Sequence, residues 1–219
     1  MKFVRAIYNQ FSKLYIYITY NKSGSTICLR VDFAYCLLLC DPFERCIMLK
    51  IVNSMRELSF SQLMNIYSEG NREYGAELYP HLSDVEQVRE AEQDFYQYLQ
   101  DIFFRQKGSF YGLWEVSGVC RTALRMEPYA DGVLLCALET EPGYRRKGYA
   151  SVLICAVLDY LFQLGSPKVY SHVSKKNLPS LLVHKKCGFE IIMDHAVYSD
   201  GSVVQSSYTL CYNIKKSET

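Results

Sequence analysis

Hydrophobic and polar positions along this chain follow two patterns, one typical of strands and one typical of helices. Short hydrophobic runs bounded by turn residues predict seven strands, at residues 49–52, 109–116, 119–126, 132–138, 168–173, 189–198 and 203–212. Hydrophobic positions at helical spacing predict four helices, at residues 60–69, 84–105, 148–164 and 178–186. Residues 70–83, between the first two helices, are expected to form a loop.

This order predicts an α+β fold, in which the helices flank a mixed and mostly antiparallel central sheet. Residues 133–138, 148–164 and 168–173 form a strand-helix-strand unit, so the two strands of this unit are expected to be parallel. Asp200 and Gly201 predict a tight hairpin turn between the last two strands.

The first 47 residues differ in character from the rest of the chain. They contain two β-prone runs, at 13–20 and 26–40, separated by turn residues, which predicts a hairpin. Because Met48 opens a new strand-like run, we expect residues 1–47 to be an appendage or an over-extended start of the reading frame. Residues 48–219 are then the main domain.

Composition favours a folded protein, because 49% of the 219 residues are hydrophobic. The net charge of +1 gives no overall attraction to nucleic acid or to an anionic membrane. No basic stripe interleaves the 19 Tyr and 11 Phe, so these aromatic residues are expected in the core and in a cleft. Without a leader-like or membrane-spanning run, we expect a soluble, cytoplasmic protein with no nucleic-acid or membrane partner.

The nine cysteines include no pair spaced as Cys-x-x-Cys, and several lie inside hydrophobic runs. This pattern favours reduced cysteines that pack as small hydrophobic residues in a reducing compartment. A zinc site formed by Cys36, Cys40 and Cys46 is conceivable, but their spacing matches no common framework. We therefore expect no metal site.

A basic turn at residues 145–150 carries the most specific signal in the chain. Arg145, Arg146 and Lys147 precede Gly148 at a junction between a strand and a helix. A helix N-terminus offers free backbone N–H groups and the positive end of a dipole, so the turn is expected to bind a phosphate. An NTPase P-loop is excluded, because Tyr149 and Ala150 stand where Lys and Ser or Thr are required. The dinucleotide fingerprint fails because it needs three glycines.

Two segments together resemble the GNAT superfamily of N-acetyltransferases. Arg145-x-x-Gly148-x-Ala150 is similar to the acetyl-CoA motif of that family, Gln/Arg-x-x-Gly-x-Gly/Ala. The segment from Asn177 through Ser180 to Gly188 and Phe189 is similar to the second cofactor segment, in which an Asn opens a short helix that ends in Gly-Phe. From the residues alone, Asn177 is expected to cap the helix and Gly188 to take a left-handed conformation after it.

The resemblance implies acetyl-CoA as the co-substrate and transfer of its acetyl group to a primary amine in a ternary complex. It places coenzyme A at residues from three segments: Leu138, Glu139, Thr140, Arg145, Arg146, Lys147, Gly148, Tyr149, Ala150, Asn177 and Ser180. His184 stands where the family usually has a tyrosine acid. For the base, His172, Glu139 and a chain of water molecules remain alternatives.

The resemblance also places the wall of the acceptor pocket at about residues 67–84. Four carboxylates lie there against a single Arg72, so a cationic amine, on a small molecule or a peptide, is the expected acceptor. The alternative is a protein that binds acetyl-CoA as a sensor or interaction module without turnover. Binding of nucleic acid by the basic turn is a third alternative, and a homodimer stays open.

Overall fold

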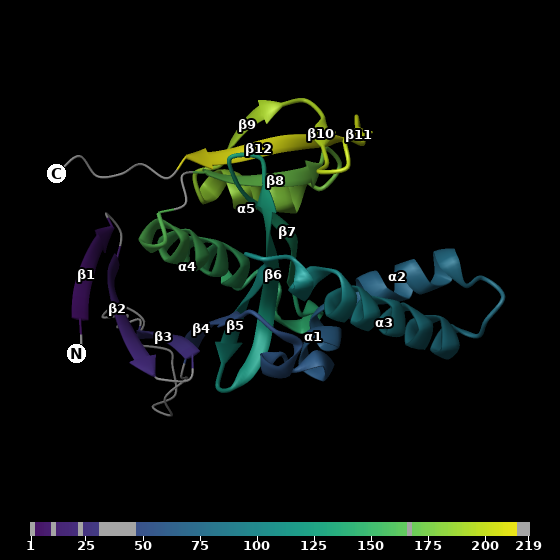
Figure 1. Ribbon diagram of the computed structural model, residues 1–219, viewed down its shortest axis with the longest axis horizontal. Helices are drawn as coiled ribbons and strands as arrows, with labels where there is room; N and C mark the ends of the chain where they lie inside the picture. Colours follow the sequence, from purple (N-terminus) through teal and green to yellow (C-terminus); the bar gives the residue numbers. More distant parts are fainter. Residues whose placement is uncertain (1–2, 10–11, 22–23, 31–46, 166–167, 214–219) are drawn as a thin grey trace.

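The computed structural model describes the backbone of residues 3–9, 12–21, 24–30, 47–165 and 168–213, and side chains from residue 48 onward within these ranges (Figure 1). The strands are β1 Phe3–Asn9, β2 Ser12–Asn21, β3 Gly24–Arg30, β4 Ile47–Val52, β5 Phe110–Val116, β6 Val119–Tyr129, β7 Gly132–Thr140, β8 Lys168–Ser174, β9 Glu190–Met193, β10 Ala196–Val197, β11 Val203–Val204 and β12 Ser207–Asn213. The helices are α1 Phe60–Ile66, α2 Ser68–Leu78, α3 Asp84–Asp101, α4 Tyr149–Gln163 and α5 Leu178–Lys186. Short 3-10 turns occur at Met55–Glu57, Phe103–Arg105 and Pro142–Tyr144.

Seven strands form the expected mixed sheet, in the order β4-β5-β6-β7-β8-β12-β9. Among the described strand pairs of this sheet, only β7 and β8 are parallel, as the strand-helix-strand unit predicts. Strand β12 lies between β8 and β9 and pairs antiparallel with both. At the other edge β3 pairs with β4, so β1, β2 and β3 extend the sheet to ten strands.

Helices cover the sheet on both faces, because neighbouring residues of a strand point to opposite faces. Trp114 packs into the core under α4, whereas Leu113 packs into the core under α1 and α3. Helix α4 buries a broad stripe that includes Leu153, Val157 and Leu161. In Figure 1, α4 and the group α1 to α3 lie on opposite sides of the central strands.

The loop predicted for residues 70–83 is wrong for residues 70–78, which belong to helix α2, whereas residues 79–83 do connect two helices. Gly75 serves helix packing. A Cβ atom at Gly75 would lie 2.4 Å from the carbonyl oxygen of Gln87 in α3, so only glycine allows this approach. The predicted start of α3 at Asp84 is confirmed by a capping box between Ser83 and Glu86.

Several predicted boundaries differ from the structure. The helix predicted at 60–69 ends at Ile66, and the strand predicted at 119–126 extends to Tyr129. Helix α3 ends at Asp101 instead of residue 105, and a 3-10 turn follows it. Each of the last two predicted strands is split in two, giving β9 with β10 and β11 with β12. The hairpin turn at Asp200 and Gly201 is confirmed, with Gly201 at a φ of 84°.

Candidate functional site

Strands β7 and β8 separate halfway along their length. They pair only where Val133, Leu134 and Leu135 face β8. Just beyond this point the pairing of β6 with β7 shifts register between Ala123 and Arg125, which marks a bulge. Ala137 lies in the bulge with a φ of 48°, a strained conformation for a residue with a Cβ atom. The second half of β7 therefore leaves its parallel neighbour and opens the sheet.

A cleft of about 720 Å³ lies at this opening. Its walls come from the end of β7, the basic turn, the first turn of α4 and one side of α5. The lining residues are Leu138, Glu139, Thr140, Tyr144, Arg145, Arg146, Gly148, Tyr149, Ala150, Ser151, Asn177, Pro179, Ser180, Leu182, Val183 and Lys186. Ten of the eleven residues predicted for the cofactor are in this set, and Lys147 is the one that is not.

The basic turn presents backbone N–H groups to the cleft. The first bond of α4 runs from the Val152 N–H to the Gly148 carbonyl, at 3.1 Å, so the N–H groups of Tyr149, Ala150 and Ser151 have no partner within the helix. Arg146 and Gly148 have φ values of 61° and 83°, and alternating backbone conformations of this kind form anion-binding concavities. The main chain of the turn thus has the conformation and the free N–H groups that suit an anion.

Arg145 directs its guanidinium toward carboxylates. Its two terminal nitrogens lie 2.6 Å from Glu69 on α2 and 2.9 Å from Glu139 on β7. Its Nε donates to the Thr140 carbonyl at 3.2 Å. Arg145 thus joins the predicted acceptor wall to the cofactor strand.

Lys147 and Arg121 hold the ring of Tyr144 in place. The Lys147 ammonium lies 4.5 Å from the centre of the ring, and the Arg121 guanidinium lies 3.8 Å from it. Arg121 also pairs with Glu141, at the start of the turn. These contacts fix the approach to the basic turn.

Helix α5 supplies the opposite wall. The Asn177 side chain accepts a hydrogen bond from the Ser180 N–H at 3.1 Å, so the predicted N-cap is confirmed. Sequence analysis missed six lining residues: Tyr144, Ser151, Pro179, Leu182, Val183 and Lys186. The last four follow helical spacing from Pro179, and this periodicity is the signal that could have found them.

A family model described as "Acetyltransferase (GNAT) family" matches residues 65–189, more than half of the chain. The chain belongs to the acetyltransferase (GNAT) family. The match spans the cleft from the predicted acceptor wall to the end of α5 and covers both segments that carry the sequence resemblance. No curated protein matches the chain.

Solved acetyltransferases share the fold. The N-acetyltransferase paia from Thermoplasma acidophilum, in complex with coenzyme A, matches with a TM-score of 0.50, 15% identity, and coverage of 75% of this chain and 98% of that one. A mutant spermidine N-acetyltransferase from Vibrio cholerae matches with a TM-score of 0.52, 20% identity, and coverage of 77% and 94%. The Vibrio cholerae enzyme in complex with CoA and spermine has a TM-score of 0.50, 20% identity, and coverage of 76% and 95%.

In this GNAT protein His184, on α5, is buried with 1% of its surface exposed, and it is not among the residues that line the cleft. Its Nδ1 donates to the Ser180 carbonyl at 2.8 Å, because a carbonyl oxygen can only accept. Its Nε2 is buried without a hydrogen-bond partner in the described part of the chain. Burial lowers the pKa of His184, and the bond to Ser180 opposes this shift. The ring is therefore neutral at pH 7, with Nε2 as a proton acceptor.

Glu139 lies in the cleft beside the bulge. Burial raises the pKa of its carboxyl group, and the Arg145 guanidinium works in the opposite direction. A second contact joins the acceptor wall to this strand, because the Tyr67 hydroxyl donates to the Ala137 carbonyl at 2.7 Å. Glu139 therefore sits where the acceptor wall and the cofactor strand meet.

His172 is not among the residues that line the cleft. Its ring packs edge-on against Tyr129 and Tyr198, at centroid distances of 5.3 Å and 4.9 Å. Both ring nitrogens are buried without a hydrogen-bond partner among the described residues, and burial lowers the pKa of the imidazole. Of the three predicted catalytic residues, Glu139 lines the cleft, whereas His172 and His184 do not.

Five cysteines lie in the region whose side chains are described, and all five are free thiols. Within that region no group of three or more His, Cys, Asp or Glu side chains could hold a metal ion. Cys36, Cys40 and Cys46 lie outside the described residues. Of the helices described, none combines the length and apolar character that a bilayer crossing demands.

Proposed function

We propose that this GNAT protein transfers an acetyl group from acetyl-CoA to a primary amine of a small molecule or peptide. The observation that carries the proposal is the cleft at the separated strands, where unpaired main-chain N–H groups of α4 face the end of β7. The similar Thermoplasma acidophilum enzyme was solved in complex with coenzyme A, which supports the choice of cofactor.

The basic turn would hold the pyrophosphate of coenzyme A. The backbone of the turn fits a pyrophosphate. The N–H groups of Tyr149, Ala150 and Ser151 make no bond within the helix, and Gly148 has the left-handed conformation that such a turn needs. Arg146 supplies positive charge at the rim. The acyl arm would then lie along Leu138, Glu139 and Thr140 toward the bulge.

In the proposed reaction the amine nitrogen attacks the thioester carbonyl while both substrates are bound. A C–N bond forms, the C–S bond breaks, the amine loses a proton and the departing thiolate gains one. Backbone N–H groups of β7 beyond Leu135, where its pairing with β8 ends, are suited to bind the carbonyl oxygen as it becomes an oxyanion. Arg145 and Tyr67 fix the strand that carries them.

Glu139 is the proposed base. Its carboxylate faces the cleft and burial raises its pKa, which brings a carboxylate closer to the range useful for taking a proton at neutral pH. His172 is less suited, because aromatic rings enclose it away from the cleft lining.

His184 is the proposed acid that gives a proton to the departing thiolate. Its tautomer decides whether it can do so. Because Nδ1 donates to Ser180, the neutral ring has a lone pair and no proton at Nε2. Donation to a thiolate requires the imidazolium, which burial disfavours. If His184 is the acid, activity must depend on protonation of His184 below neutral pH.

The proposed acceptor is a cationic amine. Glu69, Glu73 and Glu77 follow one another at intervals of four residues along α2, so their side chains lie on one face of that helix. Glu73 and Glu77 are exposed. At one end of this face, Glu69 pairs with Arg145 at the cleft. Like charges four residues apart on a helix repel one another, and a bound cation would relieve this repulsion.

Two measurements test the proposal. Calorimetry with coenzyme A tests binding, and thiol release from acetyl-CoA with amino acids, polyamines and peptides tests transfer. We expect binding and release with cationic amines, and a large loss of kcat in Glu139→Gln. Glu90→Gln, on the exposed surface of α3, is the matched control.

Binding of coenzyme A with no thiol release across the whole panel would favour the sensor alternative. Absence of binding would refute both functions. For His184, a His184→Phe variant that keeps the kcat of the parent protein would remove this residue from the mechanism. Loss of kcat with unchanged affinity for coenzyme A would support it.

A further inference from the structure

A pair of thiols joins the two helices that wall the cleft. The sulfur of Cys155 on α4 lies 3.9 Å from the sulfur of Cys187, the residue that ends α5. The two residues differ in access, because Cys155 is exposed and Cys187 is buried. This difference makes Cys155 the sulfur that meets an external reagent first.

The two thiols are oriented by hydrogen bonds. Cys187 donates to the Ser151 carbonyl on α4 at 3.6 Å, so its sulfur is left as the acceptor for the thiol of Cys155. When Cys155 loses its proton, the Cys187 thiol can turn and donate to the new thiolate. This hydrogen bond lowers the pKa of Cys155, while burial and the Asp159 carboxylate oppose the shift.

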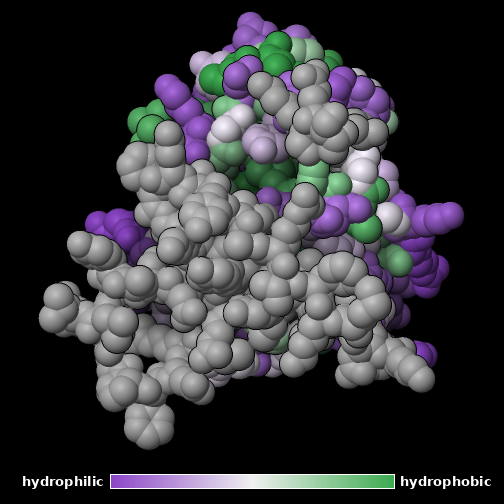
Figure 2. All heavy atoms as spheres, turned by 90° about the vertical axis from the view of Figure 1, so that its left-hand side faces the viewer, coloured by the Kyte–Doolittle hydropathy of each residue, from purple (hydrophilic) through white to green (hydrophobic). Residues whose placement is uncertain are grey.

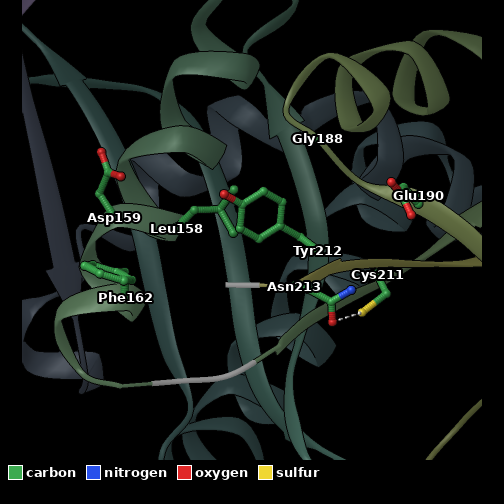
Figure 3. Close-up of a pocket in the computed structure, with 8 residues that line it drawn as sticks. All are labelled: Leu158, Asp159, Phe162, Gly188, Glu190, Cys211, Tyr212 and Asn213. Atoms are coloured by element: carbon green, nitrogen blue, oxygen red, sulfur yellow. Dashed lines mark hydrogen bonds between the residues drawn. The ribbon is translucent and has the colours of Figure 1, made fainter. Parts of the chain in front are cut away.

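A second cavity, of about 360 Å³, is lined by residues of α4 and of the segment after α5, but by neither cysteine of the pair. Asp159 lies one helical turn beyond Cys155, and Gly188 follows Cys187; both line the cavity together with Tyr212. Figure 3 shows the Tyr212 ring pointing from β12 toward Leu158 of α4, with Glu190 on the strand side. Figure 2 looks onto this side of the molecule and shows a hollow with hydrophobic residues in it. Free volume near Asp159 and Gly188 permits a shift of the two chain segments that close packing would resist.

We propose that Cys155 and Cys187 form a reversible disulfide when the protein meets a peroxide, and that this bond lowers the affinity of the cleft for coenzyme A. The Cys155 thiolate attacks one oxygen of hydrogen peroxide and the O–O bond breaks, which yields a sulfenic acid and a hydroxide that takes a proton to become water. Cys187 then attacks the Cys155 sulfur, the S–O bond breaks, and a second water leaves. Two thiols are oxidised and one peroxide is reduced to two waters.

The effect on the cleft follows from position and rests on the proposed function. A disulfide brings the sulfurs from 3.9 Å to about 2 Å, and we expect part of this change to draw the end of α5 toward α4. Ser151 lies one helical turn before Cys155, and Lys186 directly precedes Cys187. Both Ser151 and Lys186 line the coenzyme cleft. Misplacing groups of a preorganised site by about 1 Å can lower a reaction rate by up to about 10²-fold. For binding we expect a smaller effect, a loss of affinity for coenzyme A of about tenfold.

The experiment treats the full chain with hydrogen peroxide and reads out two quantities. Peptide mass spectrometry should find Cys155 joined to Cys187, with a mass lower by two hydrogen atoms than that of the separate peptides. Calorimetry should find the affinity for coenzyme A lowered about tenfold and restored by dithiothreitol. Cys155→Ser should lose both responses, whereas Cys136→Ser, which removes a free cysteine elsewhere, should keep them.

Each outcome decides the proposal. Peptides in which Cys155 or Cys187 pairs with another cysteine, or with none, would refute the bond. A Cys155–Cys187 bond with unchanged affinity would refute the effect on the cleft. If the reduced protein does not bind coenzyme A, the proposed function fails, while the peptide analysis still decides whether the bond forms. Cys187→Ala provides a second variant that must also abolish the linked peptide.

Discussion

The Tyr67 hydroxyl donates a 2.7 Å hydrogen bond to the carbonyl of Ala137, which lies in the bulge of β7 with a φ of 48°. One residue ends α1 and the other opens the cleft, so a helix junction supports a strained strand. Arg145 adds a second support of the same kind through Glu69 and Glu139. The acceptor wall is thereby attached to the strand that would hold the acyl group.

Tyr67→Phe removes the first of these supports. We expect the variant to lose about 1 kcal/mol of stability, the usual net value of one hydrogen bond, and to raise KM for the amine. Thermal unfolding and steady-state kinetics check both effects. Tyr74→Phe, on the exposed side of α2, is the matched control and should behave as the parent. Equal behaviour of the two variants would mean that the bond has no role.

Gly148→Ala tests the basic turn. Nothing lies within 4 Å of a Cβ atom built at Gly148, so the cost comes from its φ of 83° alone. We expect a loss of roughly 1–2 kcal/mol in stability and weaker binding of coenzyme A. Gly143→Ala, in the same loop and equally free of contacts, should change stability by less than about 0.5 kcal/mol. If calorimetry finds the same affinity for coenzyme A in both variants, the anion site at this turn is contradicted.

Arg145→Gln tests the charge balance at Glu139. Burial raises the pKa of Glu139 and the Arg145 guanidinium lowers it, so removing the cation should raise this pKa further. A base acts only when deprotonated, and therefore the acid limb of the kcat/KM profile should move to higher pH. Arg146→Gln should weaken coenzyme binding and leave the limb in place. An unmoved limb in Arg145→Gln would argue against Glu139 as the base.

Asp131 contributes to stability at neutral pH. Hydrogen bonds from Lys168, at 2.6 Å, and from Tyr170 hold its pKa below the ordinary value of 3.8. Stability from this carboxylate is present above the pKa of the unfolded chain and is lost as pH falls through the folded pKa. Asp131→Asn should therefore lower Tm at pH 7, and the difference from the parent should shrink in acid. A pH-independent difference would contradict this assignment.

Asp159 provides the opposite case. Burial raises its pKa above 3.8, so its ionised form costs stability as pH rises from the unfolded pKa through the folded one. Asp159→Asn should stabilise the protein at pH 7 by up to about 1 kcal/mol and have no effect well below pH 4. Urea titrations at both pH values check the sign. Destabilisation at pH 7 would show that the carboxylate has a favourable partner.

Local signals predicted much of the fold and of the cofactor side of the cleft. The strand-helix-strand unit, the Asn177 cap and the turn at Gly201 each depend on residues close together in the sequence. Helix α2 was missed because Gly75 is also typical of a loop, and only its closeness to Gln87 explains it. The pairing of Arg145 with two carboxylates was missed as well, since it joins elements far apart in the chain.

The pairing of β3 with β4 has a further consequence. Thr26, Ile27 and Cys28 oppose Lys50, Leu49 and Met48, and so they cover the outer backbone of the first strand of the main domain. A chain shortened to begin at Met48 would leave that row of N–H and C=O groups open to other chains. Removing the N-terminal segment would then show itself first as self-association and lower solubility, before any loss of the cleft.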